Sequence, residues 1–146
     1  MYMINSIGFG LMLTGISILQ MQANEDATLE EKLSAYEWQK RIILIIASSE
    51  EEADFIEQQK RLKSEINGIQ ERDLEILYLN LDRISNTDKT FLRKKFEIHD
   101  QKFCIILIGK DGTEKLRSTK PLQAEELFQT IDVMPMRQQE IRRRNK

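Results

Sequence analysis

The sequence predicts an α/β fold in which a central mixed sheet of about four strands is flanked by helices. Two runs, residues 42–46 and Phe103–Ile108, are apolar at every position, which is typical of strands buried on both faces of a sheet. Strand-like segments alternate with segments whose apolar residues recur at helical spacing, and this alternation predicts right-handed crossovers and a parallel core. After the second run, Asp111-Gly112 indicates a hairpin that adds an antiparallel strand.

The first 23 residues are predicted to be a secretory signal peptide. They contain no Lys, Arg, Asp or Glu, and residues 7–19 form an almost wholly apolar run. This run is shorter than the ~20 residues that span a bilayer but fits the apolar region of a signal peptide. We expect cleavage near Ala23, and therefore an exported protein, periplasmic or extracellular. An uncleaved anchor or a buried amphipathic helix is the alternative.

The first half of the mature chain is predicted to form two helices around a buried strand. An acidic spacer at residues 24–32 leads into a short helix or edge segment at residues 29–38, and residues 41–48 form the strand. Ser48 and Ser49 stand before three glutamates, which is typical of a helix start. A helix follows with Gly68 marking its end, and its expected inward residues are Phe55, Leu62, Ile66 and Ile69.

The second half is predicted to contain three more strands and two more helices. Residues 74–81 read as the second strand, and residues 86–88 cap a helix that carries Phe91, Leu92 and Phe96. The third strand and the hairpin follow, and residues 122–134 form a last helix before a basic tail at residues 141–146. This element order is that of a thioredoxin-like fold, for which we expect the domain to span residues 33–140.

Composition excludes several classes of protein. The net charge of −2 argues against a nucleic-acid binder, which is normally basic. A single cysteine excludes an intramolecular disulfide, a pair of redox cysteines and a thiolate zinc site. A single histidine, His99, has no second histidine at ligand spacing and is expected at the surface. We therefore predict no metal and no cofactor.

Four segments carry a resemblance to a known family: YEWQKRIILI (residues 36–45), ERDLEI (residues 71–76), IGKDGTEKLR (residues 108–117) and IDVMPMRQQE (residues 131–140). Together they resemble bacterial members of the DUDES-type domain family of unknown function (DUF4174), which has a thioredoxin- or peroxiredoxin-like fold. The resemblance implies that fold and an exported setting, since the animal relatives are secreted or associated with the matrix. It implies no settled activity.

Redox cysteines are absent from the position that thioredoxin-like enzymes use. In those enzymes the cysteines follow the first buried strand at a helix N-terminus, which stabilises a thiolate. Here the corresponding stretch is SSEEEAD, residues 48–54, whose glutamates would repel a thiolate. The only thiol, Cys104, lies among apolar residues and is expected to be buried; its alternative role is that of a redox thiol.

A candidate ligand or partner surface is predicted around the Met134–Arg137 box. Pro135 stops a helix and keeps Met134 extended, and Asp132 is close enough in sequence to pair with Arg137. Either this pair locks a helix stop, or Arg137 and Arg72 bind an anion or a carboxylate of a partner. Lys110, beside the hairpin turn, is a further candidate for this surface, although such lysines also simply keep a turn solvated.

These observations predict a non-catalytic binding or interaction module of the cell envelope. The expected partner is a protein or an anionic small ligand. The alternative is an atypical thiol oxidoreductase or peroxiredoxin-related protein that uses Cys104 in an oxidative-stress response. A third possibility is weak membrane association through the basic tail, which contains Arg142, Arg143, Arg144 and Lys146.

Overall fold

The computed structural model describes residues 27–99 and 103–146. Ten elements follow one another along these residues: α1 (Leu29–Tyr36), β1 (Arg41–Ala47), α2 (Ala53–Lys63), α3 (Ile66–Glu71), β2 (Leu74–Asn80), α4 (Asn86–Phe96), β3 (Phe103–Ile108), β4 (Glu114–Ser118), α5 (Ala124–Asp132) and α6 (Pro135–Arg144). The predicted signal peptide lies outside the described residues, and α1 begins within the segment expected as a spacer. No described helix is long and apolar enough to cross a membrane.

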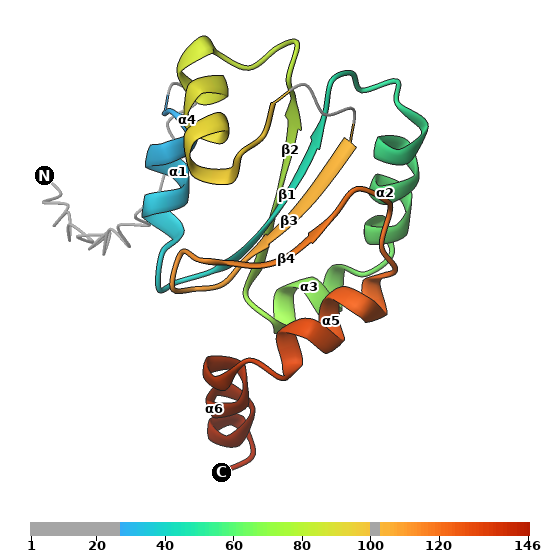
Figure 1. Cartoon of the computed structure of the whole chain (residues 1–146). Coiled ribbons are helices and arrows are strands. Elements are labelled where there is room, and N and C mark those ends of the chain that lie inside the picture. Colours follow the sequence, from blue (N-terminus) through green and yellow to red (C-terminus); the bar gives the residue numbers. More distant parts are fainter. Residues whose placement is uncertain (1–26, 100–102) are drawn as a thin grey trace, which may run out of the picture.

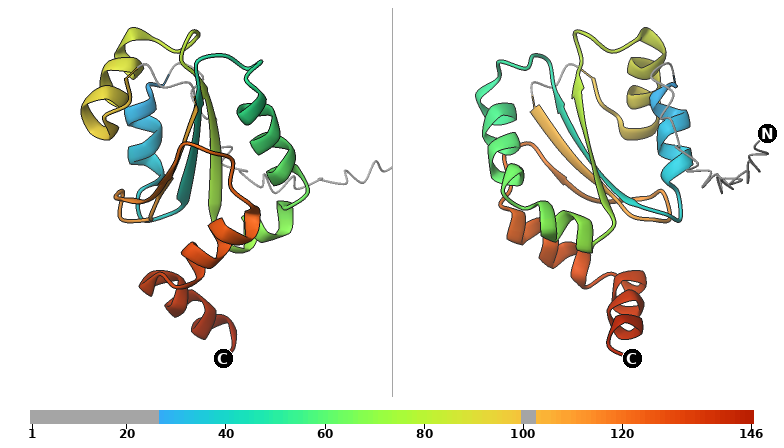
Figure 2. Two further views of the ribbon diagram at one scale, coloured as in Figure 1. Left: turned by 45° about the vertical axis from the view of Figure 1, so that its right-hand side comes forward. Right: turned by 180° about the vertical axis from the view of Figure 1, so that it is seen from behind.

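The four strands form one mixed sheet in the order β2-β1-β3-β4, which confirms the predicted architecture. Helices α1 and α4 cover one face of the sheet, and α2, α3 and α5 cover the other (Figures 1 and 2). Every residue of β1 and β3 is buried. Because side chains alternate across a strand, successive residues of these two strands point into separate apolar cores on the two faces.

The prediction of a parallel core is correct for one strand pair and wrong for the other. Strand β2 pairs with β1 in parallel, whereas β3 runs antiparallel to β1, with Phe103 opposite Ala47. A parallel β3 would require α4 to carry the chain back to the end of the sheet where β1 begins. After α4, which ends at the left-handed Glu97 (φ 55°), β3 instead starts beside Ala47, the last residue of β1, and runs in the opposite direction.

The single helix predicted after β1 is two helices, α2 and α3. Glu52, and neither of the two serines, is the N-cap of α2, so the acidic residues precede the helix instead of forming its first turn. Ile66, expected to face the core, is 59% exposed at the start of α3. Gly68 lies inside α3 and does not end it. A Cβ atom on Gly68 would lie 2.5 Å from the Phe128 ring, so close packing between α3 and α5 requires glycine there.

The C-terminal residues form a helix that the sequence reading did not predict. Met134 is extended (ψ 138°), as expected before a proline, but Pro135 then occupies the first turn of α6, where its missing N–H is tolerated. Helix α6 continues to Arg144, so most of the expected tail is helical. It projects from the end of the domain at which β1 begins (Figure 1).

Candidate functional site

The loop after β1 holds a carboxylate where a redox thiol would stand in a thioredoxin-like enzyme. Glu52 Oε1 accepts hydrogen bonds from the backbone N–H of Ser48 (2.8 Å) and of Ser49 (3.3 Å), and from the Ser48 hydroxyl (2.5 Å). The donors of this turn are therefore bound to a group of the chain itself. A carboxylate has no dithiol or peroxidatic chemistry of its own, and here it closes the turn through these hydrogen bonds.

Cys104 is buried, as predicted. Its exposed fraction is 1%, and it lies in the apolar core that β1 and β3 share with α1 and α4. Its thiol donates only a weak hydrogen bond, 3.7 Å long, to the carbonyl oxygen of Ile105. Burial raises the pKa of the thiol, and the nearby Arg117 opposes this only in part. The thiol therefore stays protonated and shielded from solvent.

The structure brings three of the four predicted surface residues into direct contact. Asp132 accepts two hydrogen bonds from Arg72, with distances of 3.0 Å from Nε to Oδ1 and 2.6 Å from Nη2 to Oδ2. Arg137 donates a third, from Nε to Oδ1 at 3.1 Å, so the predicted pair with Asp132 is present. The Arg137 side chain is 1% exposed and the Asp132 side chain 34% exposed. The carboxylate is thus held between two guanidinium groups at the surface of the domain.

The fourth residue, Lys110, joins the same cluster through Glu140. Lys110 Nζ lies 2.9 Å from a Glu140 carboxylate oxygen and donates to Asp73 at 2.9 Å. Arg41 donates two hydrogen bonds to Glu140, at 3.1 and 3.2 Å, and Arg137 Nη1 lies 3.7 Å from it. We call these eight residues the ion-pair cluster: Arg41, Glu71, Arg72, Asp73, Lys110, Asp132, Arg137 and Glu140.

Two buried arginines of the cluster also bind the end of α3. Arg137 donates to the carbonyl oxygen of Glu71 at 2.9 Å and to its carboxylate at 2.6 Å. Arg41 donates to the carbonyl oxygen of Arg72 at 2.9 Å. Carbonyl groups at a helix C-terminus lack helical partners, and these guanidinium groups satisfy them. Arg137 is the one buried residue of α6, so the cluster is what fastens α6 to the domain.

Two carboxylates of the cluster, Asp132 and Glu140, are stabilised in their charged form. Burial alone would raise the pKa values of Asp132 and Glu140. Hydrogen bonds from Arg72 and Arg137 to Asp132 outweigh this effect and lower its pKa, and those from Arg41 and Lys110 do the same for Glu140. Both groups are therefore ionised at neutral pH, and the four predicted residues are held by partners within the chain.

Sequence reasoning missed four residues of the ion-pair cluster: Arg41, Glu71, Asp73 and Glu140. Of these, Arg41 and Glu140 contact each other. An arginine immediately before a run of buried aliphatic residues needs a partner, because a buried charge is costly when unpaired. The sequence signals were the position of Arg41 and the spacing of Arg137 and Glu140 on one helix face. Neither signal identifies a contact between residues that lie 99 positions apart.

His99 is exposed, as predicted, and directly follows the buried Ile98. Within residues 27–99 and 103–146, no group of three or more His, Cys, Asp or Glu side chains could hold a metal ion.

The hairpin turn at Asp111-Gly112 is present as predicted. Gly112 has a positive φ of 74°, and the Asp111 carboxylate pairs with Lys115 Nζ at 2.8 Å.

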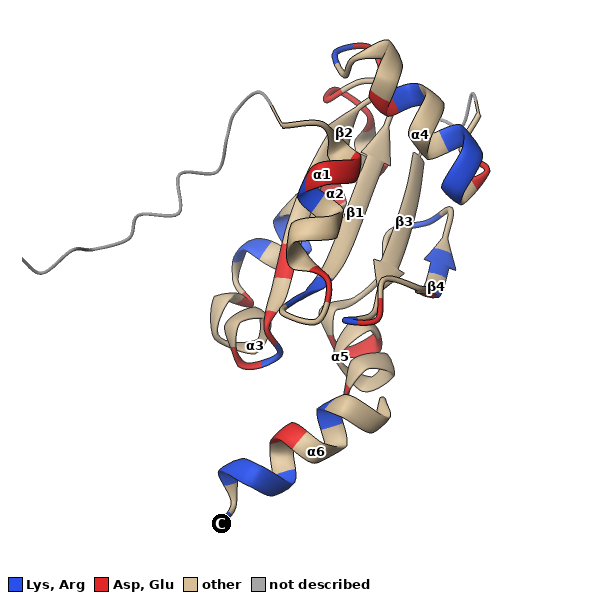
Figure 3. Ribbon diagram, turned by 90° about the vertical axis from the view of Figure 1, so that its left-hand side faces the viewer, with Lys and Arg blue, Asp and Glu red and all other residues tan. Residues whose placement is uncertain are grey.

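Charges are unevenly distributed over the helices (Figure 3). Helix α4 carries Lys89, Arg93, Lys94 and Lys95, and the last turn of α6 carries Arg142, Arg143 and Arg144. No ion pair joins any of these cations to an acidic side chain in the part of the chain that the structure describes. These two helices therefore each present a group of cations that have no acidic partner among the described residues.

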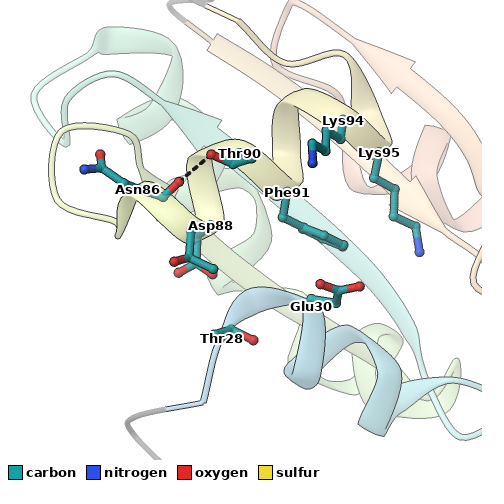
Figure 4. Close-up of a pocket in the computed structure, with 9 residues that line it drawn as sticks. Thr28, Glu30, Asn86, Asp88, Thr90, Phe91, Lys94 and Lys95 are labelled. Carbon is teal, nitrogen blue, oxygen red and sulfur yellow. Dashed lines mark hydrogen bonds between the residues drawn. The ribbon is translucent and has the colours of Figure 1, made fainter.

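A groove with a volume of about 730 Å³ lies between α1 and α4 (Figure 4). Phe91 points into it from α4, with Glu30 of α1 on the opposite side. Two lysines, Lys94 and Lys95, and two acids, Glu30 and Asp88, line the groove. Because the opposite charges are equal in number, charge favours neither an anionic nor a cationic ligand in this groove.

Comparison with known proteins agrees with this architecture. Residues 32–140 match the model of a family described as "Domain of unknown function (DUF4174)". The chain is 26% identical over 138 residues to "Coiled-coil domain-containing protein 80" of Danio rerio. The match covers 78% of this chain and 16% of the fish protein, so the chain spans only a small part of that relative.

Solved peroxiredoxin structures share the fold. The reduced 2-Cys peroxiredoxin of Plasmodium vivax superposes with a TM-score of 0.56 at 13% identity, covering 73% of this chain and 84% of that one. Thioredoxin peroxidase I of Plasmodium yoelii gives a TM-score of 0.56 at 15% identity, covering 73% of this chain and 79% of that one. At this identity the likeness establishes a thioredoxin-like fold and carries no activity with it.

Proposed function

The chain belongs to the family described as Domain of unknown function (DUF4174), and we propose that it is a non-catalytic binding or interaction module exported to the cell envelope. One observation carries the proposal. The turn after β1 is closed by the Glu52 carboxylate, and no cysteine stands there. A thioredoxin-like scaffold without a nucleophile at this position supports a role in binding over one in redox catalysis.

The Glu52 contacts explain why this turn would not support a thiolate. A thiolate at a helix N-terminus depends on free N–H groups and on the positive end of the helix dipole. In this chain the N–H groups of Ser48 and Ser49 already bind Glu52, and Glu50 and Glu51 add negative charge beside it. Two features of this turn therefore disfavour a thiolate: its N–H groups are already hydrogen-bonded, and the neighbouring carboxylates would repel a negative charge.

Peroxide and disulfide turnover by the purified protein test this proposal. We expect no consumption of hydrogen peroxide with a dithiol reductant and no reduction of a disulfide substrate above the rate of a Cys104→Ala variant. This variant is a matched control because it removes the only thiol of the chain. Turnover that the wild-type protein shows and Cys104→Ala lacks would contradict the proposal in favour of an oxidoreductase.

The proposed export is supported by the apolar run at residues 7–19 and the absence of charged side chains up to Ala23. Intact-mass spectrometry of the protein from an expressing cell measures it directly. We expect a mature chain that begins near residue 24 and is recovered outside the cytoplasm. A full-length chain in the cytoplasmic fraction would contradict export without affecting the absence of turnover.

We propose the end of the domain around the ion-pair cluster as its interaction surface. The Glu71 and Asp132 carboxylates reach the surface there, with Arg72 and Arg137 behind them. Two strongly exposed apolar side chains, Trp38 and Val133, lie near this surface. Val133 directly follows Asp132 in the sequence, and the backbone N–H of Trp38 donates a hydrogen bond to the carbonyl oxygen of Lys110. Exposed apolar groups beside fixed charges are typical of protein-binding surfaces. In this proposal the cluster positions α6 and contributes carboxylates to the partner.

A further inference from the structure

A second concave site lies at the opposite end of the sheet from the ion-pair cluster. It has a volume of about 270 Å³ and is lined by residues that directly follow the two parallel strands, Ser48 after β1 and Leu81 after β2. His99, which precedes β3, also lines it. The carboxyl ends of parallel strands form the crevice in which open α/β sheets bind their ligands. The position of this cleft in the fold therefore favours a binding site.

The polar lining of this cleft is mainly cationic. Lys89 and Arg93 lie one turn apart on α4 and both line it, together with His99, and Asp82 is the one acidic residue on its wall. Within the described residues, neither Lys89 nor Arg93 makes an ion pair. Like charges four residues apart on a helix repel each other. A bound anion would relieve this repulsion.

The cleft has an apolar floor that strengthens charge interactions. Leu92 and Ile98 line it and are buried, with exposed fractions of 0% and 2%. The backbone N–H of Ile98 donates to the carbonyl oxygen of Leu92 at 3.3 Å, which places His99 directly after this anchored residue. The left-handed Glu97 turns the chain back over α4 at this point. Apolar surroundings reduce screening by water, so anion binding gains more here than on an open surface.

We propose that this cleft binds a phosphate group, either free or as a phosphomonoester, through Arg93, Lys89 and His99. The planar guanidinium of Arg93 matches the oxygen geometry of phosphate, and Lys89 supplies a second positive charge. The imidazole of His99 supplies an N–H donor in either charge state. The cleft has room for a small group attached to the phosphate. This inference goes beyond the proposed interaction module, and its failure would leave the absence of turnover untouched.

His99 itself reports on the binding, because it is the only histidine in the chain. Its imidazole Hε1 resonance can be followed by NMR at constant pH while sodium phosphate is added. A parallel titration with sodium chloride at the same ionic strength measures the non-specific effect of salt. We expect a saturable shift with phosphate and none with chloride. Equal responses to the two salts would overturn the proposal.

Two double variants of α4 separate the cleft from the general charge of the helix. Lys89→Ala with Arg93→Ala removes the two cations of the cleft, whereas Lys94→Ala with Lys95→Ala removes the same charge from the groove of Figure 4. We expect phosphate affinity to fall by roughly tenfold or more in the first variant, because charge-assisted hydrogen bonds are lost. The second should stay within about twofold of the wild type, since only long-range attraction changes.

The folding of each variant is checked before its phosphate affinity is compared with that of the wild type. Each must keep the dispersed amide spectrum of the wild type, which α4 surface substitutions permit. A similar loss of affinity in both variants would show diffuse attraction to α4 and overturn the site.

A third titration, with phenyl phosphate, distinguishes the source of the phosphate. Tighter binding than that of inorganic phosphate supports a phosphomonoester as the ligand, and weaker binding supports the free ion.

Discussion

At the scale of single residues, Arg137 shows how one side chain can attach a helix that has almost no apolar face. It is the one buried residue of α6, and it contacts Glu71, Asp132 and Glu140. These partners come from α3, from α5 and from α6 itself. Because each of its contacts is a charge-assisted hydrogen bond or ion pair, the guanidinium fork cannot be replaced by a simple apolar group.

Replacing Arg137 by alanine is expected to lower the free energy of unfolding by about 2–4 kcal/mol. The substitution leaves the Asp132 carboxylate with Arg72 alone and strips the carbonyl of Glu71 of its donor. Urea denaturation followed by circular dichroism measures the loss. Arg142→Ala, on the same helix, is the control and should change stability by less than about 0.5 kcal/mol. A similar small effect from both substitutions would contradict the role of Arg137.

Stability is expected to fall in acid through the same cluster. Asp132 and Glu140 have pKa values that are lower in the folded protein than in the unfolded chain. Their stabilising contribution is therefore complete above about pH 5 and is lost as the pH falls below about 4, because the unfolded chain then binds more protons. Denaturation midpoints measured from neutral to acid pH should show this decrease, and Asp132→Asn with Glu140→Gln should flatten it. An unchanged slope in that double variant would assign the acid sensitivity to other carboxylates.

Of the contacts within the cluster, the sequence predicted only a local one. Asp132 and Arg137 are five positions apart, and their pairing follows from that spacing. Arg41 and Glu140 meet across most of the chain, and their contact depends on how α6 docks against the start of β1. A burial pattern shows that Arg41 needs a partner, but only the folded arrangement identifies it.

At the scale of secondary-structure elements, the buried strands are the most predictable part. The branched aliphatic run of β1 and the apolar run of β3 are buried at every position, as their composition indicates. The direction of β3 was not predictable from these runs, because a strand buried on both faces looks the same in either direction. It depends on where the chain re-enters the sheet after α4, which is beside the last residue of β1.

Helices were harder to predict where tertiary packing overrides local signals. Gly68 reads as a helix end by propensity, yet it lies within α3 because the Phe128 ring of α5 packs against its backbone. Helix α6 reads as a solvated tail because its sequence lacks an apolar stripe, yet the ion-pair cluster holds it. Both cases depend on contacts with residues that are distant in the sequence. Hydrophobic periodicity is judged within a short stretch of sequence and so carries no information about such contacts.

A methyl group at position 68 is expected to separate α3 from α5. Gly68→Ala increases helix propensity by up to about 1 kcal/mol. Its Cβ atom would, however, lie 2.5 Å from the Phe128 ring, which is too close for two carbon atoms. We therefore expect the free energy of unfolding to fall by about 1–2 kcal/mol in total. Combining it with Phe128→Leu, which shortens the opposing side chain, should recover part of that loss relative to Phe128→Leu alone. Additive effects of the two substitutions would show that the Phe128 contact is not the cause.

At the scale of the whole molecule, the two ends of the sheet differ in their charge. At the end where β1 begins, four cations and four acids pair within the chain and fasten α3, α5 and α6 together. At the end where β1 and β2 finish, Lys89 and Arg93 line an open cleft without an acidic partner in the described residues. The thioredoxin-like scaffold thus carries a structural cluster at one end and a candidate ligand site at the other. Cys104, opposite Ile46 near that second end, is buried in the core.

The most direct test of the central claim, that the domain binds without redox catalysis, is the rate at which Cys104 of the folded protein is alkylated across a range of pH, read by intact-mass spectrometry. Because the thiol is 1% exposed and burial raises its pKa, we expect negligible modification in native buffer and rapid modification after denaturation. The same spectra report where the N-terminus lies. Fast alkylation of the native protein, with a pH profile that reveals a thiol pKa below its ordinary value, would contradict the account and make Cys104 a redox centre.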